Sequence, residues 1–156
     1  MKNKFLITGG CGFIGYNFLE KCKKLRIPFL VLDKLTYSSN KFAEKELKKD
    51  NLLKRIDISD SKVTEIIKKF KPSVIVNFAA ESHVDRSIDN PLVFVNSNIL
   101  GVHNLLEICK NNLKDFKFIQ ISTDEVFGSL GFNSKKSKEN DSYKPSSPYS
   151  ASKAAA

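Results

Sequence analysis

Thr8-Gly9-Gly10-Cys11-Gly12-Phe13-Ile14-Gly15 is the stretch of sequence that decides the fold of this chain. An apolar run at residues 5–7 precedes it, and apolar residues at helical spacing follow it, namely Ile14, Phe18, Cys22 and Leu25. This order predicts a strand, a tight glycine turn and a helix. Glycines permit the turn and the close approach of a pyrophosphate, whose charge the helix N-terminus favours. The glycines fit both GxGxxG spacing (Gly10, Gly12, Gly15) and GxxGxxG spacing (Gly9, Gly12, Gly15). Because a glycine-rich turn can also be only a turn, the motif needs support from elsewhere in the chain.

Asp33 supplies that support. It ends a second apolar run, residues 29–32, at about the distance where an acidic residue hydrogen-bonds the ribose hydroxyls of a bound dinucleotide. Its carboxylate would repel a 2′-phosphate, so the sequence predicts NAD rather than NADP. Lys34 beside it weakens this preference slightly.

Apolar runs and amphipathic segments alternate along the rest of the chain. Further strands are predicted at 52–56, 74–76 and 118–121. Helices are predicted at 41–50 and at 63–70, the second capped by Asp60 or Ser61. A further helix is predicted from Pro91 onward, with an apolar stripe of Ile99, Val102, Leu106 and Cys109. This alternation predicts an α/β fold in which helices cover both faces of a parallel sheet. Ligands of such sheets bind beyond the carboxyl ends of the strands, where the polar clusters of this sequence also lie.

The composition limits the class of protein. At 156 residues the chain has the length of one domain, and 41% hydrophobic residues is ordinary for a soluble protein. The net charge of +9 comes from scattered lysines without interleaved aromatic residues, so no nucleic-acid partner is expected. No run approaches the roughly 18 apolar residues of a membrane span, and a strand at residue 5 leaves no room for a signal peptide. With three cysteines and no CxxC spacing, the expected location is the cytoplasm. Cys11 is interpreted as a small filler residue rather than a reactive thiol.

Tyr149 and Lys153 are the candidate pair for chemistry. They follow a polar loop at 128–147 and lie four residues apart in a helix that Ser147 and Pro148 would begin. A nearby ammonium group favours phenolate, so Lys153 is expected to lower the pKa of Tyr149 and make it a proton acceptor. By itself the pair could be accidental, and the glycine turn upstream favours the functional interpretation.

Together these motifs resemble the extended short-chain dehydrogenase/reductase family, and within it the dTDP-glucose 4,6-dehydratases. The narrower resemblance is carried by Asp33-Lys34-Leu35-Thr36-Tyr37, Ala79-Ala80-Glu81-Ser82-His83-Val84-Asp85-Arg86-Ser87, Ser122-Thr123-Asp124-Glu125-Val126 and Pro145-Ser146-Ser147-Pro148-Tyr149. It implies a Rossmann-like, doubly wound parallel sheet over residues 1–156, truncated before a C-terminal substrate domain. It also implies a homodimer of the full-length protein, formed through the helices near 92–109 and Tyr149.

The resemblance further implies a reaction in three stages. Tyr149, assisted by Lys153, would deprotonate the C4 hydroxyl of dTDP-glucose while NAD accepts the C4 hydride, with Thr123 bonded to the C4 oxygen. Glu125 would then remove the C5 proton, and Asp124 would protonate the departing C6 hydroxyl. Hydride would return to C6, giving the 4-keto-6-deoxy sugar. Two adjacent carboxyl groups in a closed cleft tend to split their pKa values, which would provide the required acid and base.

The resemblance also carries over the residues that contact NAD and substrate. The cofactor set is Gly9, Gly12, Phe13, Ile14, Gly15, Asp33, Lys34, Leu35, Thr36, Asp57, Ile58, Phe78, Ala79, Ala80, Glu81, Ser82, Ser97, Tyr149 and Lys153, and the substrate set is Ser82 and Thr123. No metal site is expected, because His83 has no second ligand at a suitable spacing. Phe127 replaces the usual tyrosine, and Ser38-Ser39 replaces the usual Ala-Gly near the adenosine.

Three alternatives remain open. Epimerases and decarboxylases that act on nucleotide sugars lack the Asp–Glu pair, whereas a dehydratase for UDP- or CDP-glucose would retain it. A non-catalytic NAD-binding module would be expected to lose Tyr149 or Lys153. Members of the family are about twice as long, so the 156-residue chain alone is expected to bind NAD weakly, if at all, and not to turn over.

Overall fold

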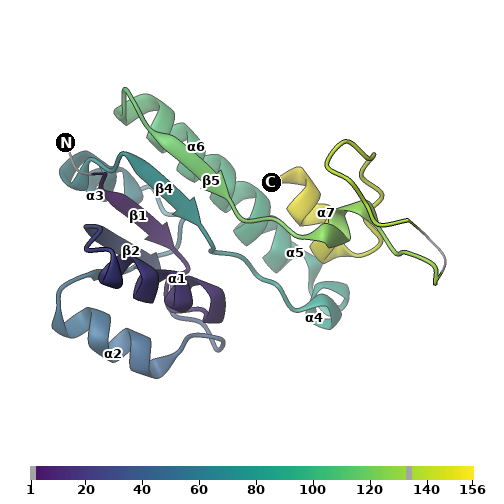
Figure 1. Cartoon of the computed structure of the whole chain (residues 1–156), viewed down its shortest axis with the longest axis horizontal. Coiled ribbons are helices and arrows are strands. Elements are labelled where there is room, and N and C mark those ends of the chain that lie inside the picture. Colours follow the sequence, from purple (N-terminus) through teal and green to yellow (C-terminus); the bar gives the residue numbers. More distant parts are fainter. Residues whose placement is uncertain (1–2, 133–134) are drawn as a thin grey trace.

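The computed structural model describes residues 3–132 and 135–156, so Asn133 and Ser134 of the predicted loop lie outside the described residues. Its centre is a parallel sheet in the order β3-β2-β1-β4-β5 (Figure 1). The strands are β1 (Phe5–Thr8), β2 (Phe29–Asp33), β3 (Leu53–Arg55), β4 (Val74–Asn77) and β5 (Lys117–Gln120). The helices are α1 (Phe13–Lys24), α2 (Lys41–Lys49), α3 (Val63–Phe70), α4 (Val84–Asp89), α5 (Pro91–Phe94), η1 (Val95–Leu100), α6 (Gly101–Asn112), η2 (Asp124–Phe127) and α7 (Pro148–Ala155).

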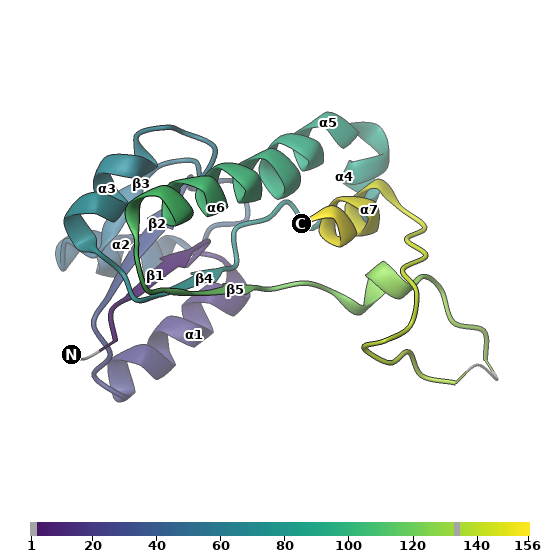
Figure 2. The same cartoon turned by 90° about the horizontal axis from the view of Figure 1, so that it is seen from above.

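Helices cover the two faces of the sheet with separate apolar cores. Leu6, Leu30 and Ile75 pack against α3 and α6 on one face, while Ile7 and Val31 pack against α1 and α2 on the other. Successive strand residues point to opposite faces, so strands buried on both faces must be apolar throughout. Figure 2 shows α1 and α6 on opposite sides of the sheet. The predicted doubly wound, Rossmann-like sheet is confirmed.

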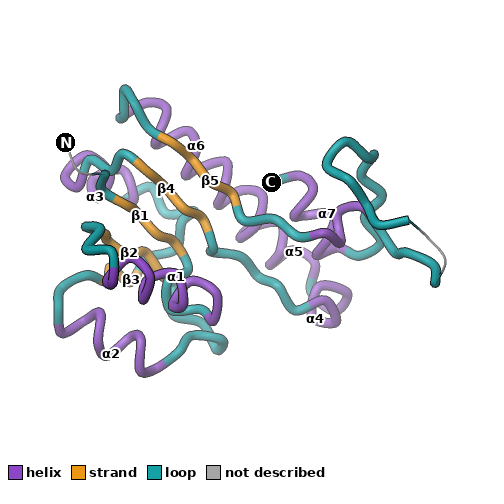
Figure 3. The backbone as a smooth tube through the Cα atoms, in the orientation of Figure 1, coloured by secondary structure: helices purple, strands orange, loops and turns teal. Residues whose placement is uncertain are grey.

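The chain leaves the sheet at its carboxyl-terminal edge. Beyond that edge lie α4, α5, η2 and α7 (Figure 1), and α7 contacts the other three and η1. The described residues between η2 and α7 form a loop without regular elements (Figure 3). The sheet and this second group of helices are the two supports on which the candidate site is built.

The helix that begins at Pro91 differs from the prediction in its buried face. Residues Val95–Leu100 form a π-helical segment, which inserts an extra residue per turn and shifts the side chains that follow. Val102 and Cys109 of the predicted stripe are buried, whereas Leu106 of that stripe is exposed and Leu105 is fully buried against the sheet in its place. By length and composition Pro91–Asn112 is apolar enough to cross a membrane, but 44% of its apolar 18-residue stretch is buried inside the protein. Its packing on the sheet makes it a core helix.

The helix predicted after the glycine turn is confirmed as α1, on which Cys22 is buried, Phe18 is half-buried and Ile14 is exposed. The predicted cap of α3 is wrong. Its N-cap position is Lys62, without a side-chain cap, while Asp60 accepts a hydrogen bond from the Lys62 N–H (2.8 Å) in the preceding turn.

Candidate functional site

The glycine turn connects β1 to α1, and two of its glycines cannot be replaced without displacing backbone. Gly9 has φ +67°, and a Cβ there would lie 2.6 Å from the Ala79 nitrogen. A Cβ on Gly15 would collide with the Gly9 carbonyl. A Cβ on Gly12 would meet only the Gly9 oxygen, at 3.3 Å, so this position otherwise faces open space. Gly12 is also the N-cap of α1, with no side-chain cap and no acidic residue in the first turn. These features fit a dinucleotide phosphate, because the uncapped helix N–H groups can donate to it.

Asp33 is held against this turn. Its Oδ2 accepts the Cys11 N–H (2.9 Å) and its Oδ1 accepts the Leu35 N–H (2.8 Å). An ionised carboxylate can accept about four hydrogen bonds, so two sites remain for ribose hydroxyls. Asp33 thus has a structural role in the turn as well as the predicted binding role.

A cavity of about 80 Å³ lies at the carboxyl ends of β1, β2, β3 and β4. From the predicted cofactor set it is lined by Gly9, Gly12, Asp33, Lys34, Thr36, Asp57, Ile58, Phe78, Ala79, Ala80, Glu81 and Ser97. It is also lined by Leu32, Ser38, Ser39 and Ile56, which were not predicted to bind. The other predicted cofactor residues, Phe13, Ile14, Gly15, Leu35, Ser82, Tyr149 and Lys153, lie outside its lining. The cavity therefore gathers most of the predicted residues but not the Tyr–Lys pair.

Lys34 forms ion pairs with two carboxylates at the cavity. Its Nζ lies 3.1 Å from Glu81 and 3.7 Å from Asp57, which come from the ends of β4 and β3. Its charge is therefore shared with two acids. Lys34 consequently offers a 2′-phosphate less attraction than an unpaired lysine would.

A chain of polar side chains crosses the sheet beneath the cavity. Thr8 donates to Asn77, and Asn77 donates to Gln120 (2.7 Å). The Ala79 N–H donates back to Thr8 Oγ1 (3.3 Å). These three side chains are in register on β1, β4 and β5, so they fix the strand ends that carry the cavity wall.

Tyr149 and Lys153 lie beyond the sheet on α7. Ser147 caps this helix in a reciprocal pair of hydrogen bonds with Ser150, and Pro148 occupies its first turn, as the sequence predicted. The Thr123 side chain lies close to the Tyr149 hydroxyl and lowers its pKa. The Lys153 Nζ donates to the Ile121 carbonyl (2.5 Å), and burial lowers its pKa. The structure thus brings Thr123, Tyr149 and Lys153 together at the end of β5.

The predicted lowering of the Tyr149 pKa is wrong for this chain. Burial of the side chain raises that pKa, the nearby Thr123 side chain lowers it, and the charges of Glu125 and Asp124 raise it. Burial of the phenol is the main physical reason, and the negative charges of Glu125 and Asp124 add to it, while the Lys153 ammonium donates to a backbone carbonyl. A positive charge from another source would be needed to favour phenolate.

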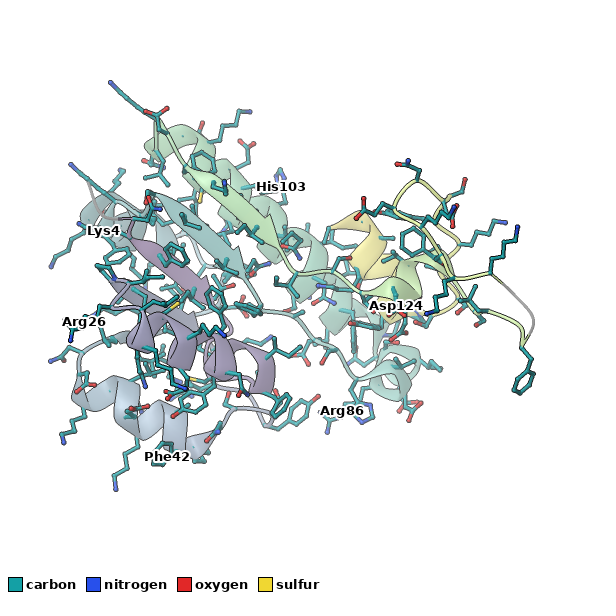
Figure 4. The ribbon with its side chains drawn as sticks, viewed as in Figure 1. Lys4, Arg26, Phe42, Arg86, His103 and Asp124 are labelled. Carbon is teal, nitrogen blue, oxygen red and sulfur yellow. The ribbon has the colours of Figure 1, made fainter. Side chains whose placement is uncertain are left out.

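Asp124 and Glu125 begin η2, whose N-cap Thr123 accepts the Glu125 N–H (3.3 Å). Figure 4 places Asp124 beyond the sheet, beside α7. Both carboxylates are exposed, so the described residues do not form the closed cleft that was expected around them. Ser82 is exposed as well.

Asn98 is a site-supporting residue that the sequence did not indicate. It is buried in η1, where its Oδ1 accepts the Glu81 N–H (2.8 Å) and its Nδ2 donates to the Glu81 carbonyl and to Ser152 Oγ (both 2.9 Å). Asn98 thereby joins the cavity wall to α7. A lone asparagine in an apolar helix gives no signal of such a contact.

Cys11 is fully buried inside the turn, and burial raises the pKa of its thiol to about 12. It is a filler side chain, as predicted. Within residues 3–132 and 135–156, no group of three or more His, Cys, Asp or Glu side chains is placed to hold a metal ion.

The chain was compared with families and proteins of known identity. Residues 6–156 match the family model described as GDP-mannose 4,6 dehydratase. A dTDP-glucose 4,6-dehydratase from Xanthomonas campestris pv. campestris is 43% identical over 97% of this chain and 46% of its own length. The chain spans about half the length of the curated relatives it matches.

Two solved structures show how the fold relates to those relatives. The Streptomyces venezuelae dTDP-glucose 4,6-dehydratase with NAD and TYD bound has a TM-score of 0.82 at 36% identity, covering 97% of this chain and 48% of that one. The Thermus thermophilus UDP-glucose 4-epimerase in complex with NAD has a TM-score of 0.87 at 30% identity, with the same coverage. The backbone alone therefore does not separate dehydratases from epimerases. The match across residues 6–156 shows that this chain belongs to the GDP-mannose 4,6 dehydratase family.

Proposed function

We propose that this chain is the NAD-binding half of a dTDP-glucose 4,6-dehydratase. The single observation that carries the proposal is that the Tyr149 phenol lies close to the Thr123 side chain, immediately before the Asp124-Glu125 pair. This arrangement offers two hydroxyls to one substrate oxygen and two carboxyl groups for an elimination. The relatives named dTDP-glucose 4,6-dehydratase, about 40% identical along this chain, support the same substrate class.

NAD fits the cavity by the chemistry of its walls. The uncapped N-terminus of α1 would hold the pyrophosphate, and Asp33 would accept the ribose hydroxyls with its two remaining lone-pair sites. The Asp33 carboxylate would repel a 2′-phosphate, and the charge of Lys34 is already paired with Asp57 and Glu81. The site should therefore prefer NAD to NADP. When bound, NAD supplies the acceptor for the C4 hydride and the donor that returns hydride to C6.

The protein residues would handle the protons. Tyr149 would take the proton of the C4 hydroxyl while Thr123 orients the C4 oxygen. Lys153, which is buried and donates to the Ile121 carbonyl, would hold a positive charge one helical turn from Tyr149. The resulting ketone acidifies the C5 proton, which Glu125 would remove while Asp124 protonates the leaving C6 hydroxyl.

The remaining predicted cofactor contacts belong to this proposal. Phe13, Ile14, Leu35 and Ser82 lie outside the cavity lining but within two residues of residues that form it. Phe13 and Ile14 are exposed at the N-terminus of α1, where a long dinucleotide would pass on its way to α7. Ser82 is exposed and would be available to the substrate.

An epimerase is the second candidate, because a UDP-glucose 4-epimerase has the higher TM-score. Epimerisation needs no acid–base pair at C5 and C6, so Asp124 and Glu125 favour dehydration. A dehydratase for UDP- or CDP-glucose uses the same residues in this half.

We further infer a cytoplasmic homodimer. Exposed apolar side chains of the long helix, Leu92, Val95, Leu100 and Leu106, give a surface that a second copy could cover. The isolated 156-residue chain is expected to bind NAD weakly and not to turn over.

The substrate is tested with the full-length product of the reading frame that encodes this chain. Each of dTDP-, UDP- and CDP-glucose is incubated with the enzyme and NAD, and products are identified by mass spectrometry and NMR. The proposal expects the loss of one water from dTDP-glucose and much less from the other two. An epimer of unchanged mass would contradict dehydration. Preferential dehydration of UDP- or CDP-glucose would contradict the proposal that the substrate carries thymine as its nucleotide base.

A further inference from the structure

Tyr37 and Arg86 form a contact that the reaction does not require. The Arg86 guanidinium lies 3.8 Å from the centre of the Tyr37 ring. Cation–π contacts are counted out to about 6 Å, so this is a close stack. In Figure 4 Arg86 extends from α4 toward the segment that follows β2.

Neither residue lines the cavity itself, but each lies near one of its walls along the chain. Tyr37 lies between Thr36 and Ser38, which both line the cavity and whose hydroxyls are 3.0 Å apart. Arg86 lies on α4, which directly follows the wall formed by residues 79–81. The Tyr37–Arg86 bridge therefore joins the β2 wall to the β4 wall.

The chemistry of Arg86 favours stacking over an ion pair. Asp85 and Asp89 lie on the same helix, yet within the described part of the chain no carboxylate forms a salt bridge with Arg86. The planar guanidinium stacks on aromatic rings in a way that a lysine ammonium does not. Tyr37 is 60% exposed, so the pair can separate without disturbing the core.

We propose that the Tyr37–Arg86 bridge is a gate that slows both entry and release of the dinucleotide. The inference rests on the proposed NAD site and adds a residue pair that controls exchange. Because the bridge must open for the dinucleotide to pass in either direction, it opposes binding and release alike. An exposed cation–π contact is worth about 0.5–1 kcal/mol, so the gate is open for about one third to one sixth of the time. Loss of the contact should therefore raise the association and dissociation rates of the dinucleotide about three- to sixfold. The dissociation constant should change much less than either rate.

The gate is tested by stopped-flow fluorescence of NADH with the full-length protein. Association is followed over a range of NADH concentrations, and release is followed by a chase with excess NAD. Arg86→Ala and Tyr37→Ala should each raise both rates about three- to sixfold, and the double variant should equal either single one, because one contact is lost in all three. Tyr37→Phe keeps the ring and should match the unsubstituted protein. Lys45→Ala, which removes an exposed positive charge from α2, controls for net charge.

The outcomes separate the gate from other roles. Slower association and weaker binding in Arg86→Ala alone would mean that Arg86 attracts a phosphate, and would overturn the gate. Unchanged rates in Arg86→Ala and Tyr37→Ala would overturn it as well. If the unsubstituted protein binds no NADH, the proposed NAD site fails first, and the gate with it. Thermal unfolding without nucleotide verifies that each variant is folded.

Discussion

Replacing Gly9 by alanine should destabilise the protein much more than the same change at Gly12. At Gly9 the residue must adopt φ +67°, which costs an alanine about 1–2 kcal/mol. Its new Cβ would also lie 2.6 Å from the Ala79 nitrogen and 2.8 Å from the Ala79 Cα and the Phe78 carbonyl carbon. Backbone must move to relieve this overlap, at a further cost of about 1–3 kcal/mol. The sum is roughly 2–5 kcal/mol, a large part of the ~5–15 kcal/mol that stabilises a domain.

Gly12→Ala is the matched control. Gly12 has φ −75°, which any residue adopts, and its Cβ would meet only the Gly9 oxygen, at 3.3 Å. Its cost should stay below about 1 kcal/mol, since alanine is merely a poorer N-cap than glycine. Because its Cβ would face the cavity, however, Gly12→Ala should weaken NAD binding at least about tenfold, or ~1.4 kcal/mol.

Urea denaturation followed by far-UV circular dichroism gives the free energy of unfolding of each variant, and titration calorimetry gives the NAD affinity. The expected result is a crossed pattern, with stability lost at Gly9 and affinity lost at Gly12. If Gly9→Ala were as stable as Gly12→Ala, the close approach of the turn to Ala79 would be refuted. Unchanged NAD affinity in Gly12→Ala would refute the position of the pyrophosphate.

Three further outcomes are expected. Tyr149→Phe should lower kcat about 10²–10⁴-fold, since it removes the proton acceptor, while NAD affinity should persist; activity within a few-fold of the unsubstituted enzyme would contradict that role. In NMR of ¹³C-labelled tyrosine, Tyr149 should titrate above its ordinary pKa of 10.0. The double variant Asp124→Asn, Glu125→Gln should have a lower Tyr149 pKa, because two negative charges near the phenolate are lost. A higher pKa in that variant would contradict the placement of η2. Burial lowers the pKa of Lys153 in the folded state, so between that pKa and 10.5 the unfolded state binds more protons and the free energy of unfolding rises with pH. In Lys153→Met this contribution to the rise should be absent. A pH profile of the unfolding free energy that is the same in both proteins would show that Lys153 is not buried.

The fold could be predicted because its signals are local. Residues 29–32 and 74–76 are apolar throughout, as strands buried on both faces must be, and the glycine turn marks the first crossover. Helix faces were less accurate, since on α6 Leu105 is buried rather than Leu106, and which of two adjacent leucines meets the sheet depends on tertiary packing. The short helix Val84–Asp89 was missed because its polar sequence has no apolar stripe, and contacts with α5 and α7 support it.

The site was predictable where a motif carries the chemistry. The roles of Asp33 and Tyr149 follow from their spacing in the sequence. The two backbone hydrogen bonds that the Asp33 carboxylate accepts, and the bond from Lys153 to the Ile121 carbonyl, cannot be predicted from sequence. The raised pKa of Tyr149 depends on burial and on the relative placement of α7 and η2, which come from distant parts of the chain. The same holds for Asn98 and for the Tyr37–Arg86 bridge, whose partners meet only in the folded chain.

The most direct test of the central claim follows one deuterium atom. The full-length product is incubated with NAD and dTDP-glucose that carries deuterium at C4, and the product is examined by NMR. If this chain holds the NAD of a 4,6-dehydratase, the deuterium should be found at C6 of a 4-keto-6-deoxy sugar, because the hydride taken from C4 is returned within the same site. Deuterium retained at C4 of an epimerised sugar, or a 4-keto-6-deoxy product without deuterium at C6, would contradict the account.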